Sequence, residues 1–231
     1  MMQFNENFIG YPPNTTIEFS GGDQKFMYDQ NLIDQPQDWY YRFNTITYEY
    51  NSLGHRCKDI KDIDLDNYLL FSGCSHTEGI GLELEKTFSY LVANQLGMDY
   101  YNLALGGSGV DAMTYNLLTW LTTVKKLPKA VVILRPIPTR FMLEINDRLS
   151  FVNASSNDNN ENRFLALGDE IGYFETMKNL YEQLIKTNYR DTKIIFIDAW
   201  ELEVFDLARD MSHAGNISNG ILAKRIIKKL K

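Results

Sequence analysis

From Tyr68 onward, short apolar runs alternate with stretches in which apolar residues recur at helical spacing. Four runs have the length and composition of buried strands: Tyr68–Phe71, Tyr100–Leu103, Ala130–Leu134 and Lys193–Ile197. Apolar residues recur at helical spacing, and so predict helices, from Phe88 to Leu96, Leu117 to Val124, Ile171 to Ile185 and Ala223 to Leu230. Strands that alternate with helices are typical of a parallel sheet covered by helices. The pattern therefore predicts an α/β domain over residues 66–231.

The first 65 residues have a different pattern, rich in Tyr, Asn, Gln and Thr and interrupted by turn signals. Within them, Tyr41–Tyr50 is dense in β-forming residues and predicts one antiparallel or edge strand. Because so polar a segment cannot bury a core of its own, we expect residues 1–65 to be a β-rich N-terminal extension packed on the main domain. A second polar segment, residues 141–168, is predicted to be an insertion, since a loop of this length is typically a lid or binding loop or is locally disordered.

Composition limits the possible functions. The chain has 231 residues, 44% of them hydrophobic, which is enough for one α/β domain with some additions. Its formal net charge of −7 disfavours a nucleic-acid partner, because phosphate binding needs a basic surface. No apolar run is long enough to cross a bilayer, and the first residues do not resemble a signal peptide. We therefore expect a cytoplasmic protein without a membrane partner, although a component of a larger particle such as a virion would have the same pattern.

The first predicted strand leads directly into Gly73-Cys74-Ser75-His76-Thr77-Glu78-Gly79. A serine in a tight, glycine-flanked turn at the carboxyl end of a strand lies where α/β folds bind their ligands. Free backbone amides at such a turn can stabilise negative charge. Taken alone, the segment fits an ordinary strand-to-helix turn equally well.

A second segment, Asp210-Met211-Ser212-His213, precedes the last predicted helix. A serine hydroxyl is a weak nucleophile that needs a base, usually a histidine oriented by a carboxylate. The chain has only three histidines, at positions 55, 76 and 213, which narrows the choice of base. In isolation, an Asp-x-x-His match is more often a solvated loop.

A third segment, Asn102–Gly109, follows the second predicted strand and contains three glycines. Glycines allow backbone N–H groups to approach a ligand closely, as an oxyanion site requires. A turn that needs small residues only for packing would have the same composition.

Taken together in their order along the chain, the three segments resemble the sequence blocks of the SGNH (GDSL-type) hydrolases. The first block, Gly-Asp-Ser-x-[Ser/Thr]-x-Gly, is matched by Gly73–Gly79, and the second, Asn-Leu-Ala-x-x-Gly-Ser, by Asn102–Ser108. The last block, Asp-x-x-His, is matched by Asp210 and His213. The resemblance covers roughly residues 51 to 230. It implies a three-layer α/β/α sandwich with a parallel, flavodoxin-like sheet.

The resemblance also implies a function and a set of site residues. The expected activity is that of a serine hydrolase that cleaves ester-linked acyl groups without a cofactor. Ser75 is the expected nucleophile, His213 the base and Asp210 the residue that orients it, and the backbone N–H groups of Ser75 and Gly107 would hold the oxyanion. The expected substrate-binding residues are His76, Asn102, Ser108 and Thr139. The abundant aromatic residues and polar loops favour a small-molecule or glycan ester, and an acylated carbohydrate in particular.

The sequence departs from the family pattern at two places. Cys74 replaces the usual Asp, whose role is to support the turn. After the third strand, Arg135–Arg140 replaces the block Gly-x-Asn-Asp, and Ile137 stands about where the Asn oxyanion donor belongs. Isoleucine cannot donate a hydrogen bond, so we predict Arg140 as the replacement donor. Thr139, Arg135 or backbone donors alone are alternatives, and Arg140 paired with a carboxylate would have no catalytic role.

Two other interpretations stay open at this point. A non-catalytic module with the SGNH fold, structural or glycan-binding, would also explain the missing Asn. The pairs His55-x-Cys57 and Cys74-x-His76 offer the ligand types of a structural zinc site. Their spacing is shorter than usual and nothing in the sequence brings the two pairs together, so no metal is expected.

Overall fold

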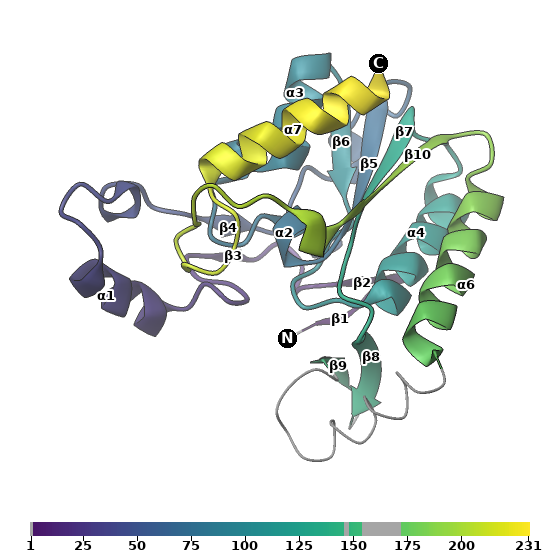
Figure 1. The fold of residues 1–231 in the computed structure, drawn as a ribbon. Coiled ribbons are helices and arrows are strands. Elements are labelled where there is room, and N and C mark those ends of the chain that lie inside the picture. Colours follow the sequence, from purple (N-terminus) through teal and green to yellow (C-terminus); the bar gives the residue numbers. More distant parts are fainter. Residues whose placement is uncertain (1, 146–147, 154–171) are drawn as a thin grey trace.

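The predicted strands form one parallel sheet in the spatial order β6-β5-β7-β10 (Figure 1). The computed structural model describes residues 2–145, 148–153 and 172–231. Its sheet consists of β5 (Tyr68–Gly73), β6 (Asp99–Asn102), β7 (Ala130–Arg135) and β10 (Lys193–Asp198). β5 pairs with both β6 and β7, so the first strand of the sheet lies inside it. In order along the chain this is 2-1-3-4, which matches a flavodoxin-like sheet and confirms the predicted fold class.

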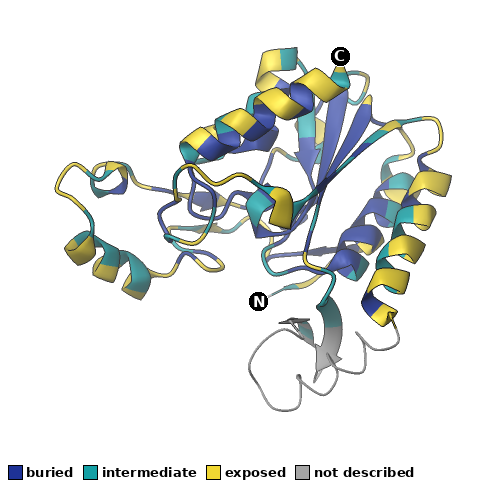
Figure 2. Cartoon of the chain, viewed as in Figure 1, coloured by how far each residue is buried: buried dark blue, intermediate teal, exposed yellow. Residues whose placement is uncertain are grey.

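Helices cover both faces of this sheet (Figure 1). One face carries α3 (Phe88–Leu96) and α7 (Asn216–Leu230), and the other carries α4 (Val110–Val124) and α6 (Tyr173–Asn188). Successive residues of β5 face opposite layers, as the pleat of a strand requires: Leu69 packs with the α3–α7 layer and Leu70 with the α4–α6 layer. The two middle strands, β5 and β7, are buried almost throughout (Figure 2). The four predicted helices are confirmed within the described residues, while Ile171 lies outside them.

Residues 2–65 contain only short elements. β1 (Gln3–Asn5) pairs with β2 (Phe8–Gly10), and β3 (Thr16–Ile17) pairs with β4 (Tyr48–Glu49), both antiparallel. Between β3 and β4 lie α1 (Lys25–Asp34), which has no buried residue (Figure 2), and the 3-10 helix η1 (Tyr40–Arg42), and the 3-10 helix η2 (Ile60–Asp62) follows β4. The division of the chain into an extension and a domain at residue 65 stays a prediction.

The single strand predicted over Tyr41–Tyr50 is wrong. Its start forms η1, and only Tyr48–Glu49 pairs as a strand. The β-forming residues of this segment are instead buried against the main domain, in a cluster that joins Tyr41, Ile46, Tyr48 and Tyr50 to Ile80, Leu105 and Ala112. Tertiary packing of aromatic side chains has thus overridden their preference for strands.

Three short helical segments and a hairpin complete the described elements. They are α2 (Ser75–Glu78), the 3-10 helices η3 (Leu84–Lys86) and η4 (Ala199–Glu201), and the antiparallel pair β8 (Arg140–Ile145) and β9 (Arg148–Asn153). The hairpin forms the first part of the predicted insertion, whose positions 146–147 and 154–168 lie outside the described residues. No helix in the described part of the chain is long and apolar enough to span a bilayer.

Candidate active site

Ser75 stands immediately after the central strand β5, at the first position of α2. The turn that places it there depends on Gly73, whose φ is +154°. A Cβ atom at Gly73 would lie 2.3 Å from the Thr77 hydroxyl oxygen and 2.6 Å from the Leu134 carbonyl oxygen. Only glycine fits this approach, so the turn holds Ser75 at the carboxyl edge of the sheet.

His213 and Asp210 reach Ser75 from the loop before α7. The Nε2 atom of His213 lies 2.7 Å from Ser75 Oγ, and its Nδ1 atom is hydrogen-bonded to Asp210 Oδ2. Because an ionised carboxylate only accepts hydrogen bonds, Nδ1 carries the proton and Nε2 can accept the proton of the Ser75 hydroxyl. The Asp210 side chain is fully buried and that of His213 is 15% exposed. Ser75 and His213, which lie 138 positions apart in the sequence, are thus joined with Asp210 by one chain of hydrogen bonds.

Both carboxylate oxygens of Asp210 are engaged. Oδ2 binds the imidazole, and Oδ1 accepts the backbone N–H groups of Ser212 and His213, each at 3.1 Å. Burial by itself would raise the pKa of Asp210, but the hydrogen bonds and charge of His213, together with the Ser212 amide, hold this pKa below its usual value. The carboxylate therefore stays ionised at neutral pH and fixes the orientation of the imidazole.

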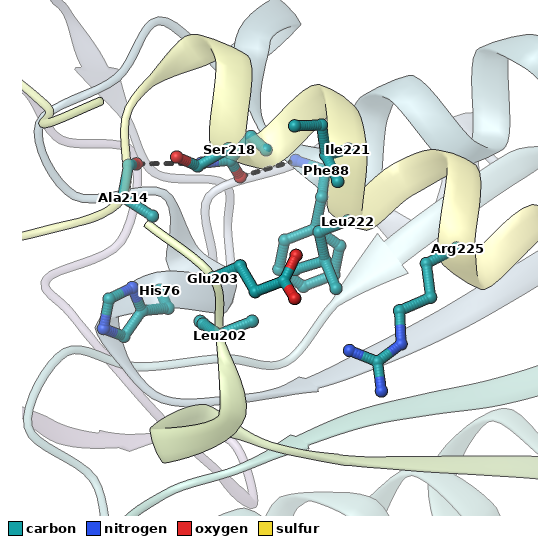
Figure 3. A pocket seen from close by; sticks show the side chains of 10 residues that line it. His76, Phe88, Leu202, Glu203, Ala214, Ser218, Ile221, Leu222 and Arg225 are labelled. Carbon is teal, nitrogen blue, oxygen red and sulfur yellow. Dashed lines mark hydrogen bonds between the residues drawn. The ribbon is translucent and has the colours of Figure 1, made fainter. Parts of the chain in front are cut away.

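His76 packs its ring edge-to-face on His213, with ring centroids 4.7 Å apart. Burial lowers the pKa of His76 to about 4, and the nearby charges of His213 and Arg140 act in the same direction. The ring is therefore neutral at physiological pH. His76 also lines a small cavity together with Phe88, Leu202 and Leu222 (Figure 3).

The second sequence block folds back on the Ser75 turn. The Asn102 side chain donates to the Thr77 carbonyl at 2.8 Å and accepts the Ala104 N–H, and the Ser108 hydroxyl donates to the Gly73 carbonyl at 3.1 Å. Asn102 is 1% exposed and Ser108 is 2% exposed. The expectation that these two side chains bind substrate is wrong, because neither reaches the surface. They fix the shape of the loop instead.

Gly106 and Gly107 bring the backbone of this loop close to Ser75. A Cβ atom on Gly106 would lie 3.9 Å from Ser75 Cβ. The Gly106 N–H donates to the carboxylate of Glu78. Within the described part of the chain, the N–H groups of Ser75 and Gly107 have no hydrogen-bond partner. These two amides are the donors that the sequence predicts for an oxyanion.

The segment from the end of β7 to the start of β8 carries the residues considered as replacements for the missing Asn. Arg135 donates to Glu182 and, at 2.7 Å, to Asp198 Oδ2, so Arg135 is wrong as a replacement donor. Ile137 is exposed, and Thr139 is half-buried.

Arg140 lies beside the second block. The Arg140 carbonyl oxygen would be 2.1 Å from a Cβ atom on Gly109, which shows how tightly this turn packs on that loop. The half-buried Arg140 side chain lines a cavity with Asp111 and Tyr181, and its charge contributes to the lowered pKa of His76. Its role as a donor stays a prediction.

The first 65 residues also contribute to the site, which the sequence did not indicate. A Cβ atom on Gly22 would lie 3.5 Å from Asp210 Oδ2 and 3.6 Å from His213 Cε1. Glu78, which holds the Gly106 amide, accepts hydrogen bonds from the Tyr11 and Tyr50 hydroxyls at 3.1 and 2.8 Å. The high density of tyrosine in this segment and the position of Glu78 inside the first block are the two sequence features from which this contribution could have been inferred.

The residues considered for zinc do not form a metal site. The His55 ring nitrogens lie 3.0 Å from the Tyr101 hydroxyl and 3.1 Å from the Ile9 carbonyl oxygen, whereas His76 packs on His213. Among the described residues, no group of three or more His, Cys, Asp or Glu side chains is arranged to hold a metal ion.

No protein-family model matches the sequence, and no curated protein matches it. Several solved structures do. One match is a carbohydrate esterase family 2 enzyme with a carbohydrate-binding domain from Corynascus thermopiles (Myceliophthora fergusii), 18% identical, with a TM-score of 0.39 over 71% of this chain and 54% of that one.

Two further matches have similar scores. The acetyl xylan esterase Est2A from Butyrivibrio proteoclasticus is 15% identical, with a TM-score of 0.38 over 71% of this chain and 63% of that one. A member of the lipolytic G-D-S-L family from Veillonella parvula is 12% identical, with a TM-score of 0.39 over 70% of this chain and 96% of that one. The chain thus spans little more than half of the first of these proteins and less than two thirds of the second.

Proposed function

We propose that the protein is a serine hydrolase that cleaves ester-linked acyl groups, with Ser75 as the nucleophile. The observation that supports this most directly is the hydrogen-bond chain from Ser75 Oγ through His213 to the buried Asp210. This arrangement provides a nucleophile, a base of the correct tautomer and a charge that stabilises the imidazolium when it forms.

The reaction would proceed in two steps. His213 Nε2 takes the hydroxyl proton as Ser75 Oγ attacks the ester carbonyl carbon, and then gives that proton to the departing alcohol. Water next attacks the acyl group on Ser75, again with His213 as the base, which releases the acid and restores the serine. During both steps Asp210 stabilises the positive charge on the His213 ring.

The developing oxyanion would be held by the backbone N–H groups of Ser75 and Gly107. The Gly106 N–H donates a hydrogen bond to the Glu78 carboxylate. This bond fixes the backbone directly before Gly107, which supports the Gly107 N–H as an oxyanion donor. Arg140 would supply the third donor in place of the missing Asn.

The acyl group would be carried by a carbohydrate. A cleft of about 330 Å³ in the N-terminal segment has Tyr11, Phe19, Ser20 and Gln24 among the residues that line it. This volume is at the lower end of the range of small-ligand sites. Aromatic rings beside hydroxyl and amide groups suit a sugar, which has apolar C–H faces and hydroxyl edges. His76 and Thr139 would contact the substrate nearer to Ser75.

A non-catalytic, glycan-binding role is the second candidate, and Ile137 at the position of the third-block Asn favours it. The intact hydrogen bonds of Ser75, His213 and Asp210 favour catalysis instead.

Labelling with a fluorophosphonate separates the two functions. We expect the wild-type protein to be labelled and to hydrolyse p-nitrophenyl acetate, and Ser75→Ala to do neither while keeping its melting temperature. A panel of acetylated sugars would then test the carbohydrate assignment. If the wild-type protein is not labelled but binds the sugars without releasing acetate, the non-catalytic function is correct.

A further inference from the structure

A buried ion pair joins the N-terminal segment to the loop that carries the proposed base. Asp23 accepts hydrogen bonds from Arg209 through both carboxylate oxygens, at distances between 2.6 and 3.1 Å. The two side chains are 1% and 4% exposed. Arg209 immediately precedes Asp210 in the sequence, so the pair is anchored one residue from the proposed catalytic carboxylate.

Further contacts hold this ion pair in place. The Tyr48 hydroxyl donates to Asp23 Oδ2 at 2.6 Å and accepts the N–H of Gly81 at 2.8 Å. The Gly81 carbonyl in turn accepts the N–H of Arg209 at 3.0 Å, which closes a ring of contacts among three segments of the chain. The Arg209 guanidinium also lies over the ring of Phe19, 4.6 Å from its centroid. Arg209 is therefore fixed mainly by residues from the first 65.

The loop that follows Arg209 has a backbone conformation that needs such support. Met211, between Asp210 and His213, has a φ of +55°, which is unfavourable for a residue with a side chain. Backbone hydrogen bonds from Met211 to Ala208 and from Ala208 to His213, each at 2.9 Å, define this tight loop. Conformations of this kind persist only where the surrounding structure enforces them.

We propose that Asp23 is a positioning residue for the Asp210–His213 pair, and that the first 65 residues are therefore part of the catalytic apparatus. This inference rests on the proposed function. Asp23 touches neither the substrate nor Ser75. By fixing Arg209 it sets the position of the loop, and the loop sets the distance between His213 and Ser75 on which proton transfer depends.

The test compares Asp23→Asn with Asp29→Asn, the same substitution in an exposed ion pair on α1. For Asp23→Asn we expect kcat on p-nitrophenyl acetate to fall about 10- to 100-fold, with KM nearly unchanged. Asp29→Asn should match the wild type. The double variant Asp23→Asn/Arg209→Gln should lower kcat no further than Asp23→Asn alone, because either change removes the same ion pair.

Two milder variants keep the test decisive if Asp23→Asn does not fold. Asp23→Glu keeps the charge and should recover most of kcat, and Tyr48→Phe removes one hydrogen bond from Asp23 and should lower kcat several-fold. A folded Asp23→Asn with wild-type kcat, or a folded Asp23→Glu that recovers none of the lost kcat, overturns the positioning role. A wild-type protein that is neither labelled by a fluorophosphonate nor active would instead overturn the proposed function.

Discussion

The sheet and the N-terminal segment pack against each other, but different interactions stabilise the two regions. In β5 and β7, the buried side chains are mostly aliphatic, as in Leu70 and Val132. In the N-terminal segment the fully or nearly buried side chains include Tyr48 and Tyr50, whose hydroxyls bind Asp23 and Glu78. Both regions bury apolar area, as Ile9 and Ile46 do in the N-terminal segment, but that segment depends in addition on specific pairs of polar groups.

The difference explains where the site gains its precision. Apolar packing is non-directional and tolerates small shifts, whereas a buried polar pair fixes two atoms relative to each other and is costly to leave unpaired. The sheet places Ser75 at its carboxyl edge. The polar pairs of the N-terminal segment then hold the two loops that carry His213 and Gly107 around it.

The largest expected effect is at the loop where the two regions meet. His213→Ala should lower kcat about 10⁴- to 10⁶-fold, as much as Ser75→Ala, because nucleophile and base act as one unit. Asp210→Asn should lose less if the backbone amides of Ser212 and His213 keep the loop in place. Turnover of p-nitrophenyl acetate measures both, with the melting temperature as a control for folding. His213→Ala with a tenth of wild-type kcat would exclude His213 as the base.

Arg140→Ala tests whether the oxyanion site needs a side chain in addition to the loop amides. Loss of one oxyanion donor lowers kcat about 100- to 1000-fold, so we expect a fall in this range with KM nearly unchanged. Arg190→Ala, which removes an arginine whose side chain is 82% exposed, is the matched control. An unchanged kcat in Arg140→Ala would mean that backbone donors suffice, or that catalysis does not occur here.

A pair of substitutions separates the two kinds of stabilisation directly. Leu70→Ala in β5 should lower the free energy of unfolding by about 2–5 kcal/mol and leave kcat nearly unchanged. Tyr50→Phe removes a hydroxyl that donates to Glu78 at 2.8 Å and should cost about 1–3 kcal/mol. Because Glu78 also holds the Gly106 amide, Tyr50→Phe should lower kcat more than Leu70→Ala does. Urea denaturation and steady-state kinetics measure the two quantities, and the reverse order in kcat would contradict this division of roles.

What the sequence could predict follows the same division. β5 and α3 could be predicted because apolar periodicity is a local property of the sequence. Ser75, Asp210 and His213 could be predicted because each stands in a short sequence block with its own spacing. The partnership of Asp23 with Arg209 was not visible, since nothing in a single sequence pairs residues 186 positions apart. Asn102 and Ser108 were misjudged because residue type does not reveal that a polar side chain is fully used inside the loop.

The smallest expected effect concerns His55, which links the two regions through the Ile9 carbonyl and the Tyr101 hydroxyl. Burial lowers the pKa of His55 to about 4, against about 6.5 for an unfolded chain. Between these values only the unfolded state is protonated, so stability that is complete above about pH 6.5 is lost as the pH falls towards 4. At pH 5 this loss amounts to about 2 kcal/mol for His55.

His76 should add a similar loss, since its pKa is also lowered to about 4, whereas Glu78, whose pKa is raised by burial, changes stability with the opposite sign. The wild-type slope alone therefore does not isolate His55. His55→Gln does, because it keeps a polar side chain that does not titrate. The decrease in unfolding free energy from pH 7 to pH 5, measured in urea, should be about 2 kcal/mol smaller in His55→Gln than in the wild type. Equal decreases would mean that His55 is already protonated in the folded protein, and that the two regions do not meet in a dry, neutral contact at this residue.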